Sequence, residues 1–307
     1  VLKHNTYAVL IKRAPSDNMK PNLKIKIGSI EMKNPVTVAS GTFGCGEEFE
    51  QLADIKNLGA IVSKTITLNA RVGNKPPRIA ETPAGMLNSI GLENPGVDRF
   101  LKEKLPVMAK YKIPIIVSIA GESKEEYREI AARLDKVSRI DGIEINISCP
   151  NAHTGELIAQ NERLTAEVVE AVKSATKKTV ITKLSPNVTN IVSIAKAAAE
   201  AGSDAISLIN TITAMAVDIR KKESRLGNIT GGLSGPAIKP IALHMVWKIY
   251  HSVKIPIIGM GGIMDWQDAV EFILCGARAI AVGTANFVNP GASSEIVRGI
   301  EAYLKFE

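Results

Sequence analysis

Apolar residues in this chain occur in short continuous runs that alternate with longer stretches of helical periodicity. The runs are rich in Ile and Val, and strands that are apolar without alternation are buried on both faces, as in a parallel sheet covered by helices. We expect eight such strands, within residues 35–40, 59–65, 113–120, 142–148, 179–185, 205–211, 255–263 and 279–285. Residues 123–137, 190–202 and 265–276 have the spacing of amphipathic helices between strands.

Eight strand-and-helix units predict an α/β fold of the (β/α)₈ barrel type. The helix after the first strand should begin at Glu47 and Glu48, two acids suited to a helix N-terminus. Gly59, Gly202 and Gly276 should end helices in the left-handed conformation that glycine allows. The rival architecture is a doubly wound open sheet, but the chain lacks the G-x-G-x-x-G turn that a dinucleotide site in such a sheet would need.

Three segments depart from this repeat. The stretch "LKIKIGSIEMKNPV" predicts an N-terminal β-hairpin that covers the floor of the barrel. Long connections follow the second strand, at residues 66–93, and the sixth strand, at residues 212–235. Both leave the carboxyl ends of strands, so we expect them to form walls of a pocket there.

The composition fits one globular domain. Of the 307 residues, 45% are hydrophobic and 22% are charged. We expect a single domain over residues 21–307, preceded by a disordered extension over residues 1–20 that ends near a natural start at Met19. No apolar run is long enough to cross a bilayer.

Charge and cysteine content narrow the function classes. Lys and Arg exceed Asp and Glu by 38 − 31 = 7, but the basic residues are scattered among acids, so we expect no nucleic acid or membrane partner. Cys45, Cys149 and Cys275 are far apart, and no C-x-x-C pair occurs. We therefore expect no disulfide framework and no metal site, and a reducing, cytoplasmic location.

Glycine-rich turns follow the seventh and eighth strands. Gly261, Gly262, Gly283 and Thr284 lie in these turns, "GMGGIMD" and "AVGTAN". After these two strands of a barrel, glycines allow backbone N–H groups to approach a phosphate closely. The turns predict a phosphate site, although they do not distinguish a phosphorylated substrate from a phosphorylated cofactor.

Polar side chains gather at other strand ends. Lys64 and Lys183 end two strands, which favours an anion or an electron-rich ring in the barrel mouth. Asparagines lie at or beyond strand ends or in the first long connection, at Asn88, Asn146, Asn151 and Asn210. An amide offers both a donor and an acceptor, so this set suits a flat imide or amide substrate.

Cys149 follows a buried strand and opens a Pro/Asn/Gly loop, "ISCPNAHTGE". It could be a covalent nucleophile, a general base or a packed thiol. A nucleophile would need an activating histidine, and His153 is in the same loop, but the spacing alone does not establish a pair. A cysteine base needs no such partner. Cys45, in a glycine-rich turn, and Cys275, in an apolar helix, look structural.

Together these segments resemble the class 1 dihydroorotate dehydrogenases, and most of all the catalytic subunit of class 1B. The similar motifs are "SGTFG", "KTITLNARVGNKPPRIAETPAGMLNSIGLENPG", "INISCPN", "KLSPN", "GGLSGPAIKP", "GMGGI" and "VGTA". The resemblance covers the chain from about Leu23 to its end. It implies an FMN-binding barrel that oxidises dihydroorotate to orotate in pyrimidine biosynthesis.

The resemblance also implies roles for individual residues. Cys149 would be the base that removes the C5 proton of the substrate, while the C6 hydride passes to FMN. Substrate contacts would come from Lys64, Asn88, Ser89, Ile90, Gly91, Leu92, Asn146, Asn151, Asn210 and Thr211. FMN would be held by Ser40, Lys64, Thr65, Ser118, Asn146, Lys183, Ile209, Gly235, Gly261, Gly262, Gly283 and Thr284.

The electron acceptor needs its own argument. Class 1B implies NAD⁺, yet this chain has neither a dinucleotide motif nor the cysteines for an iron–sulfur cluster. Electrons would then have to leave through another protein. The resemblance implies a partner subunit that carries FAD and a [2Fe–2S] cluster, in a heterotetramer built on a homodimer of this chain. Alternatives are a class 1A enzyme linked to fumarate, a related flavin barrel that acts on dihydropyrimidines, and a non-catalytic phosphate- or nucleotide-binding barrel.

Cys149→Ala should keep bound FMN and lose most turnover, because the substrate would lack its base. The expected loss is on the order of 10²–10⁴-fold. Steady-state rates and the flavin content of the purified variant check this. A near-normal rate would remove Cys149 from the mechanism.

Overall fold

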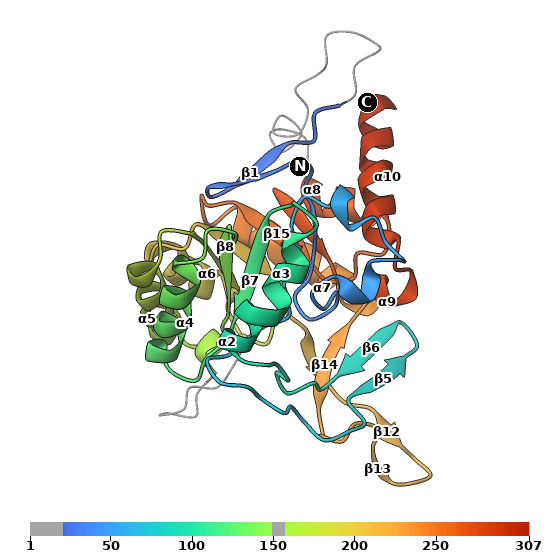
Figure 1. Cartoon of the computed structure of the whole chain (residues 1–307). Helices are drawn as coiled ribbons and strands as arrows, with labels where there is room; N and C mark the ends of the chain where they lie inside the picture. Colours follow the sequence, from blue (N-terminus) through green and yellow to red (C-terminus); the bar gives the residue numbers. More distant parts are fainter. Residues whose placement is uncertain (1–20, 149–156, 307) are drawn as a thin grey trace.

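The computed structural model describes residues 21–148 and 157–306, and its centre is a barrel of eight parallel strands surrounded by helices (Figure 1). The strands are β3 (Val36–Val38), β4 (Ile61–Val62), β7 (Ile115–Ile119), β8 (Gly142–Asn146), β9 (Thr179–Lys183), β10 (Ala205–Leu208), β15 (Ile257–Met260) and β16 (Ala279–Val282). Their order around the barrel is their order in the sequence, and β16 pairs in parallel with β3. The predicted (β/α)₈ barrel is confirmed.

The barrel closes between β3 and β4 through a close backbone approach at Gly59. The Gly59 N–H donates to the Val36 carbonyl at 2.8 Å, and Thr37 Oγ1 donates to the Ala60 carbonyl at 2.9 Å. A Cβ atom on Gly59 would lie 2.1 Å from the carbonyl oxygen of Asn34. The left-handed cap predicted at Gly59 is therefore wrong: its φ is not positive, and glycine is needed there for space.

The other two glycines behave as predicted. Gly202 follows α6 (Ile191–Glu200) with φ 97°, and Gly276 follows α8 (Trp266–Leu274) with φ 110°. Both conformations are readily open only to a residue without a Cβ atom. Each glycine thus turns the chain from the end of a helix toward the next barrel strand.

Helices cover the outside of the barrel. Besides α6 and α8, the α-helices are α2 (Val97–Arg99), α3 (Leu105–Ala109), α4 (Lys124–Asp135), α5 (Glu162–Ala175), α7 (Lys239–Tyr250), α9 (Ala285–Val288) and α10 (Ala292–Phe306). A π-helical stretch, η3 (Phe100–Lys104), joins α2 to α3, where Pro106 lies at the start of α3. A proline lacks the N–H that would donate to the preceding turn of a regular helix. A departure from α geometry is therefore expected in the turn before Pro106, and η3 is that turn.

The helix expected to begin at Glu47 is instead two short 3-10 turns, η1 (Glu47–Phe49) and η2 (Ile55–Asn57). An α-helix here would need a continuous apolar stripe against the barrel. Leu52 is 61% exposed, and Phe49 turns back to stack on Phe43, with ring centroids 4.1 Å apart. The acidic start was correctly located, but the segment buries too little surface to sustain a longer helix.

The predicted hairpin forms one end of the barrel. Strands β1 (Ile25–Ile27) and β2 (Ile30–Met32) pair antiparallel, and their four inward side chains pack with small and apolar residues inside the barrel. At its turn, the Ser29 N–H donates to Thr179 Oγ1 at 2.8 Å. Figure 1 shows this hairpin at the end of the barrel opposite the antiparallel sheet. The hairpin therefore closes the barrel floor, as predicted.

The two long connections meet at the other end. The first supplies β5 (Ile79–Thr82) and β6 (Gly85–Asn88); the second supplies β11 (Ile212–Ala214), β12 (Val217–Asp218), β13 (Glu223–Ser224) and β14 (Gly231–Ser234). Strands β14 and β6 pair antiparallel and join the connections into one sheet of order β11-β14-β6-β5. A small hairpin of β12 and β13 projects beyond it (Figure 1).

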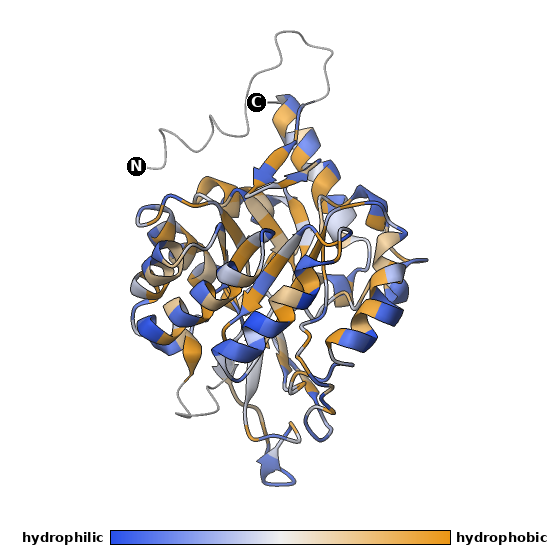
Figure 2. Cartoon of the chain, turned by 60° about the vertical axis from the view of Figure 1, so that its left-hand side comes forward, coloured by the Kyte–Doolittle hydropathy of each residue, from blue (hydrophilic) through white to orange (hydrophobic). Residues whose placement is uncertain are grey.

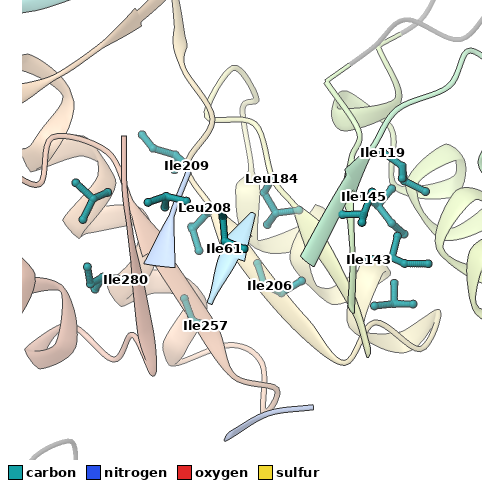
Figure 3. Packing of buried hydrophobic residues seen from close by; sticks show 14 of the residues in the cluster. Ile61, Ile119, Ile143, Ile145, Leu184, Ile206, Leu208, Ile209, Ile257 and Ile280 are labelled. Carbon is teal, nitrogen blue, oxygen red and sulfur yellow. The ribbon is translucent and has the colours of Figure 1, made fainter. Parts of the chain in front are cut away.

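The main core lies between the strands and the helices. It contains the alternate strand residues that face outward from the barrel, including Ile143, Ile206 and Ile280, which Figure 3 shows among buried neighbours. Figure 2 shows hydrophobic residues concentrated on the central strands and hydrophilic residues on the outer faces of helices. No helix in the two described ranges is both long and apolar enough to cross a membrane.

Replacing Gly59 with alanine should destabilise the protein by about 3 kcal/mol, because the new Cβ atom would overlap backbone atoms of the neighbouring strand segment. Urea unfolding measures the loss. Gly291→Ala is the control, since a Cβ atom there would meet only flexible side-chain atoms, at 3.2 Å. Equal stability of the two variants would show that the closure tolerates a side chain at Gly59.

Candidate active site

A cavity of about 590 Å³ lies at the carboxyl ends of the barrel strands. Barrel residues such as Lys64, Lys183 and Gly261 form its floor and rim, and Met86 and Gly232 of the antiparallel sheet form a wall. The long connections after the second and sixth strands thus contribute to the pocket, as predicted. With one exception, every predicted contact residue that the structure describes lines this cavity.

Two lysines reach the cavity from different strands. Lys183 ends β9, is 4% exposed, and its Nζ donates to Ser40 Oγ at 3.0 Å. The same Nζ lies 3.9 Å from Glu144 Oε1. Lys64 follows β4 and is half-buried. The cavity therefore carries positive charge on its barrel side, which suits an anionic or electron-rich ligand.

Amide and hydroxyl groups cluster beside β8. Asn210 Nδ2 donates to Ser148 Oγ at 2.7 Å and lies 3.3 Å from Asn146 Oδ1. Across the cavity, Asn88 Nδ2 donates to the Gly232 carbonyl at 3.2 Å. Asn151 lies outside the described residues. Three of the four predicted asparagines are therefore brought to one cavity, where they offer both donors and acceptors to a ligand.

Glycines from the loops after β14, β15 and β16 line another part of the cavity, the last of them being Gly283. Gly235, Gly261 and Gly262 have φ values of 95°, 121° and 82°. A Cβ atom on Gly262 would lie 2.9 Å from both the Gly235 carbonyl oxygen and the Lys239 nitrogen. Thr284, at the start of α9, donates from Oγ1 to Ser234 Oγ at 2.8 Å. Glycine-rich turns next to helix starts are able to bind phosphate, so this part of the cavity is a candidate phosphate site.

Comparison with known proteins gives the family of the chain. The family model described as dihydroorotate dehydrogenase matches residues 22–304. The chain belongs to the dihydroorotate dehydrogenase family.

Similar proteins of this family come from several bacteria. Over 287 residues, the chain is 53% identical to a protein of Desulforudis audaxviator, 55% to one of Desulforamulus reducens and 52% to one of Trichlorobacter lovleyi. In each case the match covers 93% of this chain and 94% of the relative. All three are named dihydroorotate dehydrogenase B (NAD(+)), catalytic subunit. The predicted family is confirmed, and so is the predicted similarity to the class 1B catalytic subunit.

Within this dihydroorotate dehydrogenase fold, Ser118 is the predicted contact that does not line the cavity. It is fully buried on β7, and its Oγ shares a hydrogen bond of 2.9 Å with Thr65 Oγ1. Thr65 itself lines the cavity. Ser118 therefore lies behind the wall and orients Thr65.

Several cavity residues were not predicted from the sequence. Asn74 Nδ2 donates to Ser89 Oγ at 2.9 Å and supports the loop of residues 88–92. Ser148 and Ser234 each accept a side-chain hydrogen bond from a predicted residue. Asn74 and Ser234 lie in the long connections, where nothing in the sequence marks them. Ser148 could have been found from its position next to Cys149.

The described cysteines lie in environments that suppress the thiolate. Burial, reinforced by the nearby Glu48 carboxylate, raises the pKa of the Cys45 thiol to about 11. Burial also raises the pKa of Cys275. Cys149 lies outside the described residues, and its role stays a prediction. The environments of Cys45 and Cys275 agree with the structural roles predicted for them.

Cys45 should resist alkylation in the folded protein. With a pKa of about 11, roughly one thiol in a thousand is ionised at pH 8, against about a quarter for an ordinary cysteine. Iodoacetamide should therefore modify Cys45 at least about a hundredfold more slowly in buffer than in denaturant. Peptide mass spectrometry over time measures both rates, and rapid modification in buffer would contradict the assigned pKa.

Proposed function

We propose that this chain binds FMN and oxidises dihydroorotate to orotate. The observation that carries the proposal is one cavity that combines a glycine-lined backbone cradle, a buried lysine and a cluster of asparagines. The chain belongs to the dihydroorotate dehydrogenase family, and the relatives compared above are named as catalytic subunits of an NAD⁺-linked enzyme of this activity.

The residues present fit FMN. The cradle of Gly235, Gly262 and Gly283 is suited to its phosphate. A Cβ atom on Gly262 would collide with Gly235 and Lys239, so glycine is what lets these backbones pack closely, and glycine-rich turns allow backbone N–H groups to approach a phosphate. Lys183 can then stabilise negative charge on the ring system. The remaining contacts are proposed for Ser40, Lys64, Thr65, Asn146, Ile209, Gly261 and Thr284, with Ser118 acting through Thr65. When bound, FMN supplies the acceptor for the hydride from C6 of dihydroorotate.

The substrate chemistry fits the rest of the cavity. Dihydroorotate has ring amides and a carboxylate. We propose that Asn146, Asn210 and Thr211 pair with the ring amides, as would Asn151 outside the described residues, and that Lys64 faces the carboxylate. Asn88, Ser89, Ile90, Gly91 and Leu92 would close over the ring from the antiparallel sheet. Complementary donors and acceptors fix the ring in one orientation and reject analogues that leave buried groups unpaired.

Cys149 is the proposed general base. Its thiolate removes the proton from C5, and the bond between C5 and C6 becomes double as the hydride leaves C6. The neighbouring Ser148 lines the cavity, so the chain enters the Cys149 loop at the substrate region. No described cysteine competes for this role, because burial raises the pKa values of Cys45 and Cys275.

Electrons must then leave through another protein. The relatives are named as catalytic subunits, which indicates a second subunit, and this chain has no dinucleotide-binding motif. We propose a heterotetramer of a homodimer of this chain with two partner subunits that carry FAD and [2Fe–2S] and pass electrons to NAD⁺. We also propose a cytoplasmic location, in keeping with its few, dispersed cysteines.

An anaerobic visible spectrum of the purified, FMN-loaded chain tests this function. Addition of dihydroorotate should bleach the yellow flavin band, because the first half-reaction needs only this chain. Dihydrouracil, which lacks the carboxylate, is the control substrate and should leave the band unchanged. Subsequent NAD⁺ should not restore the colour at a competent rate.

Each outcome has a separate meaning. Bleaching by dihydrouracil alone would favour a dihydropyrimidine-oxidising barrel. Restoration by NAD⁺ without a partner would contradict the proposed subunit, and rapid restoration by fumarate would favour the class 1A form. A chain that binds no FMN would overturn the proposed function.

A further inference from the structure

A buried carboxylate lies directly behind the lysine of the cavity. Glu144, in the middle of β8, is 2% exposed, and it does not line the cavity. Its Oε2 accepts a hydrogen bond from Ser207 Oγ at 3.0 Å, while Oε1 has no hydrogen-bond partner within the described structure. A charged group in such a place is costly unless another charge compensates for it.

The compensating charge is Lys183. Its Nζ is 3.9 Å from Glu144 Oε1, too far for a hydrogen bond but close enough for strong attraction across a buried space. Glu144 and Lys183 are the two charged side chains that are buried in the described part of the chain. Each charge also has a hydrogen bond with a neutral hydroxyl: Lys183 donates to Ser40, and Glu144 accepts from Ser207.

The geometry gives the two charges different access to a ligand. Lys183 faces the cavity, and its Nζ is held toward the rim by Ser40. Glu144 is one layer deeper, on the neighbouring strand, where Asn146 pairs in register with Lys183. A ligand in the cavity thus contacts only the ammonium of Lys183. The electrostatic potential at the ligand nevertheless depends on both charges, since buried charges are poorly screened.

We propose that Glu144 is a positioning and charge-balancing residue that lowers the reduction potential of FMN bound in the cavity. The inference rests on the proposed function, since it requires FMN beside Lys183. Alone, Lys183 would favour the reduced, more negative ring and raise the potential. The carboxylate behind it offsets part of that effect, so the reduced cofactor gives up electrons more readily to an acceptor.

Glu144→Gln tests the inference, because the amide keeps the size of the side chain and can still accept from Ser207 while the charge is lost. The potential of the bound FMN, measured by equilibration with a redox dye, should become more positive by at least about 30 mV. For this two-electron couple, that shift equals a tenfold gain in affinity for reduced over oxidised FMN. Binding titrations of the two forms measure the gain independently of turnover.

Two further variants separate charge from structure. Ser207→Ala removes the hydrogen bond to Glu144 but keeps both charges, and it should move the potential much less. Glu144→Asp keeps the negative charge but moves it farther from Lys183, because the side chain is one methylene shorter. The potential should therefore shift in the same direction as in Glu144→Gln, by a smaller amount. This variant provides the test if Glu144→Gln does not fold.

The inference would be overturned by an unchanged or more negative potential in the glutamine variant. If only the aspartate variant folds, an unchanged potential in that variant would overturn it. So would an equal shift in Ser207→Ala, because the effect would then follow from packing. Failure of the unaltered chain to bind FMN would instead overturn the proposed function, and with it this inference.

Discussion

Parallel pairing of eight strands in sequence order is the constraint on which the rest of the structure depends. Because every barrel strand runs the same way, all eight carboxyl ends come to one rim, and residues far apart in the chain become neighbours there. Ser40, Lys183 and Asn210 belong to three different βα units, yet they line the same cavity. Closure of the barrel imposes a steric constraint at one position: at Gly59 two backbone segments approach so closely that no side chain fits.

The barrel alone would leave the carboxyl ends of its strands open to solvent on one side. The antiparallel sheet adds a wall there and encloses the site. Its central contact, between β6 and β14, joins segments that follow different barrel strands. Asn88 and Gly232 are paired in this register, and both line the cavity. The wall therefore depends on two connections of the right length, each anchored in the rigid barrel at its ends.

The sequence predicted the barrel well because buried parallel strands are apolar throughout, a strong local signal at all eight positions. It predicted the site through residue types placed at strand ends, and the cavity brings together Lys64, Lys183 and three asparagines. It did not predict the 3-10 turns after β3, because their cause is the packing of Phe49 on Phe43 rather than local periodicity. Glu144 was also overlooked: in "GIEINIS" its alternation with Ile resembles a solvent-facing position, whereas here the alternate face points into the barrel.

The hairpin at the barrel floor has a consequence for the size of the site. The side chains of Ile27 and Met32 belong to the same packed column as Ala39, Met260 and Ala281. The last three also line the cavity, so the top of this column is the bottom of the pocket. The depth of the pocket is thus set by how much of the barrel interior the packed side chains of this column occupy. Small residues such as Ala39 and Ala281 act as spacers, and the ligand-binding volume is set in part from the opposite end of the barrel.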